Sequence, residues 1–264
     1  MSYRSKKVLD GYVKLISKTG DEELVARAAR VSRNKQWEFK YEPENAELFE
    51  CLMAWGHMTP FEFIDVTFEV RCPIYIARQW FRHRTFSYME SSGRYHMLPN
   101  DFYTPPTMTA NYVKACQQDI TATYVTCAAL GVPNEDNRSI LPLGTYTTFW
   151  FKGNLRNIFH FLDLRLDKAA QKEIRAYAEA IKSILENEFP WIMFAYSRYG
   201  GINTKVISKD AHMVLQKIKK DFANQFTEEN VDVCINDLFK SDPSCGYTEK
   251  DRNKIKEEVM KFYN

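Results

Sequence analysis

Four features that would assign a protein to a specialised class are missing from this sequence. The six cysteines are scattered without a CxxC pair, and the N-terminus has no signal-peptide pattern, so we expect the cytoplasm rather than a disulfide framework. No apolar run approaches the roughly 20 residues that a membrane-spanning helix needs, so no membrane insertion is expected. No HxxxH or HD pair occurs among the five histidines, and we therefore expect no metal site.

A strong charge of one sign is the fourth absence. With 36 basic and 34 acidic residues the formal net charge is +2, too small to hold a nucleic-acid strand unless basic residues cluster locally. The chain does have size and apolar content, because 264 residues, 45% of them hydrophobic, suffice to bury a substantial core. Aromatic residues make up 14% of the chain, and such residues are more often core than ligand-binding.

Hydrophobic periodicity predicts an α+β protein with few strands. Residues 64–72 alternate strictly between apolar and polar side chains, the pattern of a half-buried strand, and a weaker strand or turn is expected at 8–16. Residues 19–21 are expected to cap a helix that runs to Arg30. Further helices are predicted at residues 43–56, 73–84, 109–131, 137–151 and 154–188, with a break near Asp167, and in amphipathic segments of 202–264.

Basic side chains concentrate in residues 78–94, where Glu90 is the only acid. Arg78 and Arg82 are four positions apart and would share a helical face. Residues 85–106 are predicted to form a structured loop, in which serines and a glycine let the backbone approach a ligand closely. Guanidinium groups bind phosphates with two parallel hydrogen bonds, so we interpret the span as a phosphate pocket. By composition alone, a solvated helix end with a Ser-rich turn is the more frequent alternative.

The spacing inside this span resembles the signature of the flavin-dependent thymidylate synthases, usually called ThyX. The signature is Arg82-His83-Arg84, then seven residues, then Ser92, with Arg94 two positions further on. Other segments match in family order, and these are residues 28–32, 57–62, 73–81, 138, 141–143, 154–156, 164–167 and 169–175. The match covers about residues 8–200, so we predict a synthase domain at 1–200 and a C-terminal helical extension of unknown role at 201–264.

This resemblance implies the fold and the reaction. The fold would be ThyX-like α+β, with helices around a small, mainly antiparallel sheet, in a homotetramer whose active sites lie between subunits. The reaction would be the reductive methylation of deoxyuridine monophosphate (dUMP) to dTMP, with 5,10-methylenetetrahydrofolate giving the carbon and bound FAD, reduced by NADPH, giving the hydride. The family needs no cysteine nucleophile. Partners would be dUMP and further copies of the chain, with no nucleic acid and no membrane.

The resemblance also implies the site residues. The nucleotide would be held by Gln79, Trp80, Phe81, Arg82, Glu90, Ser91, Ser92, Gly93, Arg94 and Arg165, together with Arg138 from another chain. The flavin would contact Thr59, Arg82, His83, Arg84, Glu90, Asn154, Leu155, Arg156 and His160. Two residues depart from the family pattern, and each weakens the expectation of a contact at its own position. Met89 stands in the signature where many relatives carry asparagine, and His160 stands at the flavin site where some relatives carry asparagine.

Arg165 is the predicted catalytic residue. It aligns with the family arginine that touches the uracil ring, where a fixed positive charge would stabilise negative charge on the base while C5 attacks. Without the family, Arg165 is more simply a helix residue paired with Asp163 or Asp167. His57 resembles a family histidine at the flavin edge that would help folate or NADPH binding, although a lone histidine after a glycine is commonly just a helix-end cap.

Two other classes of function remain as alternatives. The basic loop and its aromatic neighbours could bind single-stranded nucleic acid by stacking and phosphate contacts, but the balanced charge outside the loop argues against it. A metal-dependent nucleotide phosphohydrolase would need a His and Asp cluster that the sequence lacks. We keep the second as a runner-up only.

Overall fold

The computed structural model describes residues 4–36, 42–106, 110–200, 209–222, 225–241 and 248–263. The chain divides into two compact units, one of Met1–Leu24 and Phe61–Pro190 and one of Val25–Pro60 and Trp191–Asn264. Each unit therefore joins segments that are far apart in sequence. The division into a synthase domain at 1–200 and an extension at 201–264 stays a prediction.

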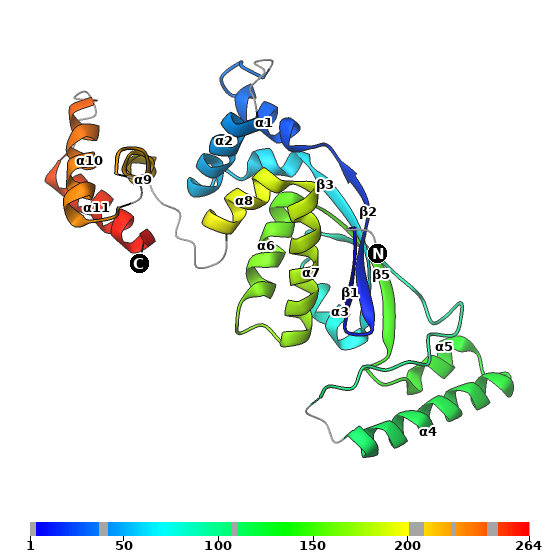
Figure 1. Ribbon diagram of the computed structural model, residues 1–264. Helices are drawn as coiled ribbons and strands as arrows, with labels where there is room; N and C mark the ends of the chain where they lie inside the picture. Colours follow the sequence, from blue (N-terminus) through cyan, green and yellow to red (C-terminus); the bar gives the residue numbers. More distant parts are fainter. Residues whose placement is uncertain are drawn as a thin grey trace. The chain divides into compact units, whose positions relative to one another are not determined.

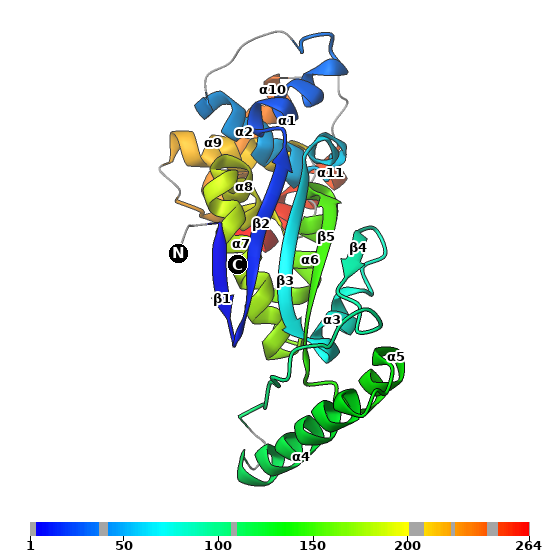
Figure 2. The ribbon, with the colours of Figure 1, turned by 90° about the vertical axis from the view of Figure 1, so that its right-hand side faces the viewer.

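A five-stranded sheet organises the first unit. The strands are β1 (Ser5–Val8), β2 (Gly11–Thr19), β3 (Asp65–Pro73), β4 (Ser87–Glu90) and β5 (Tyr146–Asn154). They lie in the order β1-β2-β3-β5-β4, and every neighbouring pair is antiparallel (Figure 2). The predicted α+β class with a small antiparallel sheet is thus confirmed.

Strand β3 shows why the sheet has a buried face. Val66, Phe68 and Val70 are fully buried, whereas the residues between them are half-buried, as the alternation predicted. The Phe68 ring stacks on Phe151 of β5, with 5.4 Å between the ring centroids. Pro73 ends the strand and directly precedes helix α3 (Ile74–Trp80), where a missing N–H costs nothing.

Helices cover one face of this sheet. They are α3, α6 (Leu155–Leu166) and α7 (Lys172–Glu188), of which α6 and α7 run along the strands (Figure 1). Trp80, the last residue of α3, is fully buried beneath them, and its ring centroid lies 4.8 Å from that of Phe161 on α6. A separate group of elements, α4 (Ala110–Ala129), α5 (Asn134–Asn137) and the 3-10 turn η2 (Arg138–Ile140), pack on one another.

The second unit contains helices from both ends of the chain. These are most of α1 (Glu22–Val31), α2 (Glu42–Ala54), α8 (Pro190–Tyr199), α9 (Lys209–Asp221), α10 (Glu228–Ser241) and α11 (Glu249–Tyr263). Asp21 caps α1 as predicted, accepting a hydrogen bond of 3.0 Å from the Leu24 N–H. The last three helices pack together, which confirms the expected helical tail for the part that is described. No helix among the described residues is long and apolar enough to cross a bilayer.

The helix predicted at residues 137–151 is wrong. Residues 137–140 form short turns, and 146–154 form β5. Phe149 and Phe151 are buried whereas Trp150 between them is largely exposed, so the segment has the period of a strand. Pairing with β3 along the whole of β5 outweighs the local helical pattern.

Two boundaries around the signature also differ from expectation. The helix predicted to reach residue 84 ends at Trp80, so Arg78 and Arg82 do not share a helical face. Its end has a tertiary cause: the Trp80 carbonyl accepts from the His83 N–H at 3.0 Å and lies 2.9 Å from the Tyr88 hydroxyl. The predicted loop at 85–106 contains the strand β4, which carries Tyr88.

Candidate active site

Arg165 lies at the centre of the candidate site. It stands in the last turn of α6, where a positive charge is favourable at the helix C-terminus. Its Nε donates a hydrogen bond of 3.0 Å to Nε2 of His83, and its Nη2 donates one of 3.0 Å to the Gln79 carbonyl oxygen. The helix thereby contacts the end of α3 and the turn after it. The described contacts of Arg165 run to this turn rather than to Asp163 or Asp167.

The His83 imidazole is a neutral acceptor. The residue is only 6% exposed, and its ring lies 4.9 Å from that of Phe161 and 6.1 Å from that of Phe86, centroid to centroid. Burial, followed by the positive charge of Arg165 and then His160, lowers the pKa of His83 to about 4. A ring that is neutral at pH 7 and accepts at Nε2 carries its proton on Nδ1.

The Arg165 guanidinium remains a cation with donors to spare. Burial and then the charge of Arg82 lower the pKa of Arg165, while Tyr88 raises it. Arginine stays protonated in proteins, so this environment leaves a charge that is poorly solvated and adjacent to another cation. Such a charge is well suited to stabilising negative charge on a ligand.

The other nucleotide residues from the first half of the signature have mixed surroundings. Gln79 donates from Nε2 to Oε1 of Gln171 at 2.6 Å. The Trp80 side chain is fully buried, so any contact with a ligand would have to come from its backbone. Phe81 packs against Tyr88, whereas Arg82 and Arg84 are exposed.

A second group of predicted residues surrounds the loop after β4. Thr147 donates to Oε1 of Glu90 at 2.8 Å, and the Ser91 N–H donates to the Thr148 carbonyl. The Ser92 hydroxyl accepts from the Arg94 N–H at 3.3 Å, and its binding role stays a prediction. The Ser91 hydroxyl, not that of Ser92, lies 3.0 Å from a histidine, His96.

Arg94 and Arg138 lie on the same side of this loop. Arg94 Nε donates to Oε2 of Glu135 at 3.2 Å, and Arg138 Nε donates to the Glu135 carbonyl at 3.3 Å. A Cβ added to Gly93 would lie 3.1 Å from Cδ1 of Leu98 and 3.2 Å from Cδ of Arg138, so Gly93 lets both side chains come close to the backbone. Arg138 therefore approaches the loop of its own chain, and its contribution to the site of another chain stays a prediction.

A third group lies where β5 passes into α6. The Asn154 side chain caps α6 by accepting from the Asn157 N–H at 3.0 Å, and Leu155 is buried. Arg156 forms an ion pair with Glu62 on the surface. His160 follows one turn later and is exposed. The resemblance assigned these residues to the flavin, and a capped helix N-terminus beside a cation is a site that suits phosphate.

His57 and Thr59 belong to the second unit. Gly56 adopts a left-handed φ of 69°, and the His57 N–H donates to the Leu52 carbonyl at 2.8 Å, which is the Schellman end of α2. The alternative that His57 follows a helix cap is therefore confirmed, and a contact with folate or NADPH stays a prediction. Thr59 begins the 3-10 turn η1 (Thr59–Phe63).

Sequence reasoning missed two residues that contact the predicted ones. Gln171 was read only as part of a matching segment, and Tyr88 only as an aromatic neighbour of the basic loop. Sequence patterns could not reveal either contact, because Gln171 and Tyr88 each bind a residue of α3 that is brought near only by the tertiary fold.

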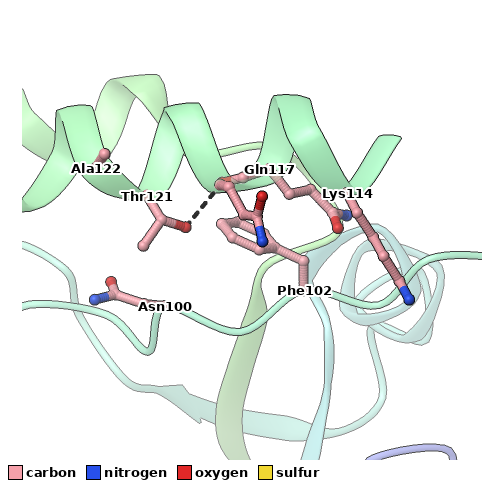
Figure 3. Close-up of a pocket in the computed structure, with 7 residues that line it drawn as sticks. Asn100, Phe102, Lys114, Gln117, Thr121 and Ala122 are labelled. Atoms are coloured by element: carbon pink, nitrogen blue, oxygen red, sulfur yellow. Dashed lines mark hydrogen bonds between the residues drawn. The ribbon is translucent and has the colours of Figure 1, made fainter. Parts of the chain in front are cut away.

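A pocket of about 420 Å³ lies elsewhere, against α4 (Figure 3). It is lined by Asn100, Phe102, Lys114, Gln117, Gln118, Thr121 and Ala122. None of the predicted site residues lines it. Among the described residues no group of three or more His, Cys, Asp or Glu could hold a metal ion.

Comparisons with known proteins show the family. A family model described as "Thymidylate synthase complementing protein" matches residues 14–191. The flavin-dependent thymidylate synthase of Thermotoga neapolitana is 42% identical over 204 residues, covering 73% of this chain and 94% of that protein. A flavin-dependent thymidylate synthase of Thermus thermophilus is 38% identical over 212 residues, covering 73% and 78%. The crystal structure of a UMP/dUMP methylase, PolB from Streptomyces cacaoi bound with 5-Br dUMP, is similar with a TM-score of 0.66 and 26% identity, over 73% of this chain and 97% of that one. The chain therefore belongs to the flavin-dependent thymidylate synthases.

Proposed function

We propose that this chain methylates dUMP to dTMP, taking the carbon from 5,10-methylenetetrahydrofolate and the reducing equivalents from NADPH through bound FAD. The observation that carries the proposal is the Arg165 guanidinium, which is half-buried and held by two uncharged acceptors, Nε2 of His83 and the Gln79 carbonyl oxygen. The family membership supports it, and so does the nucleotide analogue bound by the methylase of Streptomyces cacaoi.

In this proposal Arg165 acts on the base. A guanidinium beside the uracil stabilises the negative charge that develops when C5 attacks the carbon donor. Because the guanidinium is already fixed in position, little reorganisation is needed when that charge appears. Gln79, with its side chain tied to Gln171, would border the same part of the nucleotide.

The phosphate of dUMP would lie at the second half of the signature. Ser92 and Arg94 would supply a hydroxyl and a guanidinium group beside Gly93, and Arg138 of another chain would add a second guanidinium group. The surface contacts of both arginines with Glu135 are weak enough to be exchanged for a phosphate.

The residues present fit a flavin dinucleotide. The N-terminus of α6 offers backbone N–H groups, and Arg156 in its first turn is exposed. The signature adds two further exposed arginines, Arg82 and Arg84. When bound, FAD supplies the hydride chemistry that no side chain can supply. His160 and Glu90 would complete the contacts, together with Thr59.

A homotetramer with sites between subunits is the second part of the proposal. The 20-residue helix α4 has only two charged residues, and Tyr124 is its only buried side chain among those described. Tyr112 and Leu130 are more than three-quarters exposed, at 77% and 78%. Exposed large apolar side chains on and directly after a helix with few charges are typical of a surface covered by another chain.

Light scattering after size exclusion tests the assembly. We expect a tetramer, and we expect Val125→Glu on α4 to shift it toward smaller species because it buries a charge. Thr123→Glu adds the same charge at an exposed position on nearly the opposite side of the same helix and serves as the control. A wild-type monomer would contradict the proposed assembly.

The visible spectrum of the purified protein tests the activity first. Bound FAD whose absorption bands shift when dUMP is added supports the proposal, and dTMP formation with methylenetetrahydrofolate and NADPH completes it. A colourless protein that neither takes up FAD nor binds dUMP would overturn it and leave the single-stranded nucleic acid alternative. A cytoplasmic location is also part of the proposal, because the six cysteines are scattered along the sequence without a CxxC pair.

A further inference from the structure

Arg165 is held by two acceptors that have no charge. One is Nε2 of His83 and the other is the Gln79 carbonyl oxygen, each at 3.0 Å. An arginine in a protein interior is more often held by a carboxylate, which would orient it and also cancel its charge. Here the orientation is obtained without that cancellation.

We propose that His83 is a positioning residue, whose neutral imidazole orients the Arg165 guanidinium toward the substrate base while leaving its positive charge unbalanced. This inference rests on the proposed function, because it assigns to His83 an effect on the base through Arg165. It differs from the flavin contact that the resemblance implies for His83.

The geometry of the guanidinium supports this role. The N–H of Nε and one N–H of Nη2 point to the same side, so the two bonds occupy one edge of the planar group. The opposite edge, formed by Nη1 and the second N–H of Nη2, then faces away from His83. Two acceptors on one edge fix the orientation of the guanidinium plane. The Gln79 carbonyl alone would let the guanidinium rotate about the single hydrogen bond between Nη2 and that carbonyl.

His83 is itself held firmly enough to orient another side chain. Its ring packs against Phe161 of α6 and against Phe86. Its carbonyl oxygen lies 3.0 Å from the Tyr88 hydroxyl on β4, which also contacts the Trp80 carbonyl. The turn that carries His83 is thus tied to the sheet before any ligand binds.

The surrounding groups keep His83 uncharged. From α6 it is faced by the Arg165 guanidinium and, at 6.1 Å between ring centroids, by His160. Tyr88 lies on the β4 side, where burial raises the pKa of its hydroxyl. In the part of the chain that the structure describes, no carboxylate contributes to the pKa of His83, so no anion offsets the cost of a proton on its ring.

Spectra of ¹⁵N-labelled histidine test the contact between His83 and Arg165 without any ligand or turnover. We expect one of the five histidines to be an Nδ1–H tautomer that stays neutral down to about pH 5, and to vanish in His83→Gln. In Arg165→Ala the same histidine should titrate at a higher pH, because a neighbouring cation has been removed. An Nε2–H tautomer, or a titration unaffected by Arg165→Ala, would overturn the proposal.

Kinetics at saturating dUMP, repeated at increasing FAD concentrations up to saturation, separate positioning from flavin binding. His83→Phe keeps a ring among Phe86 and Phe161 but removes the acceptor, and we expect kcat to fall by about 10- to 50-fold with KM changed by less than about 3-fold. His83→Gln restores a neutral acceptor and should recover most of the loss. If raising FAD alone restores the activity of His83→Phe, the side chain acts at the flavin and the proposal is wrong.

A double-mutant cycle closes the test. In an Arg165→Ala background, His83→Phe should change kcat by less than about 2-fold, because the group that it orients is gone. Losses that multiply would show independent roles and contradict the proposal. Circular dichroism and urea unfolding of each variant identify any variant that fails to fold. If one does, the tautomer seen in the ¹⁵N spectra of the wild type still tests the contact between His83 and Arg165. Failure of the proposed function is recognised separately, because a wild-type protein without FAD or dUMP binding can still show the tautomer.

Discussion

The two halves of the signature are built differently, although only a few residues separate them. The first half, with the end of α3 before it, comprises residues 79–84, and the second half comprises residues 90–94. In the first half the Trp80 and His83 side chains are buried, although Arg82 and Arg84 are exposed, and the Tyr88 hydroxyl is shared between the Trp80 and His83 carbonyl oxygens. In the second half, the Arg94 side chain is 54% exposed and pairs with Glu135, which is 53% exposed. Exposed ion pairs contribute at most about 1 kcal/mol, so Arg94 is easily released to a ligand. The first half is suited to fixing a catalytic charge and the second to capturing a phosphate.

The largest expected effect comes from removing the charge that the first half fixes. Arg165→Ala should lower kcat by about 10²- to 10³-fold, because a preorganised donor to developing negative charge is lost. dUMP titration of the flavin spectrum should show a much smaller change in affinity. Arg94→Ala is the matched comparison, since it removes the same charge from the exposed half.

That contrast can fail in a clear way. If Arg165→Ala weakens dUMP binding as much as it lowers turnover, Arg165 acts on the ground state and the two halves do not differ in role. Arg165→Lys keeps a charge but loses the two-point contact with His83 and Gln79, so we expect it to recover only a small part of the rate.

Acidification should lower the stability of the fold through the buried residue of the first half, His83. Its folded pKa, about 4, is below the ordinary value of 6.5, so the unfolded chain takes up the proton first as the pH falls. Above pH about 6.5 the neutral His83 ring therefore contributes its whole share to the free energy of unfolding. Between pH about 6.5 and 4.5 that free energy should fall by about 2–3 kcal/mol.

Urea unfolding at both pH values, in wild type and His83→Gln, measures that contribution. The difference between the two proteins isolates His83 from the carboxylates, which titrate in both. An identical dependence on pH in the two proteins would mean that the His83 ring is charged or solvated when folded.

The exposed half should respond to the phosphate and not to the base. Arg94→Ala should weaken dUMP binding by about 10- to 100-fold, the equivalent of about 1.5–3 kcal/mol for a charge-assisted hydrogen bond. Binding of deoxyuridine, which has no phosphate, should be unchanged. A variant that weakens both ligands equally would show that Arg94 does not read the phosphate.

Much of this architecture could be predicted locally. Strict alternation at residues 64–72 identified β3, and the cap before Glu22 identified α1, because both patterns lie within one element. β5 was missed since its aromatic residues could be placed on either period, and only pairing with β3 decides between them. The end of α3 was missed for a similar reason, because the groups that end it include Tyr88 from another strand.

The site shows the same limit. The sequence indicated the guanidinium groups, because arginines spaced in this way around a flexible Ser-Gly turn are typical of a phosphate-binding loop. It could not indicate that His83 accepts from Arg165, since 82 residues separate them and the bond depends on how α6 packs. Local patterns report which groups are available, whereas packing decides which of them act together.

The smallest expected effect concerns the residue that departs from the family pattern. Met89 is 76% exposed on β4, so Met89→Asn should change the free energy of unfolding by no more than about 0.5 kcal/mol. Its neighbour Tyr88 points to the other side of the strand and bonds the Trp80 and His83 carbonyls, so Tyr88→Phe should cost about 1–2 kcal/mol. Urea unfolding of the pair gives the measurement. A costly Met89→Asn would mean that this edge of β4 is covered, and the exposed half of the signature would then be built as firmly as the buried one.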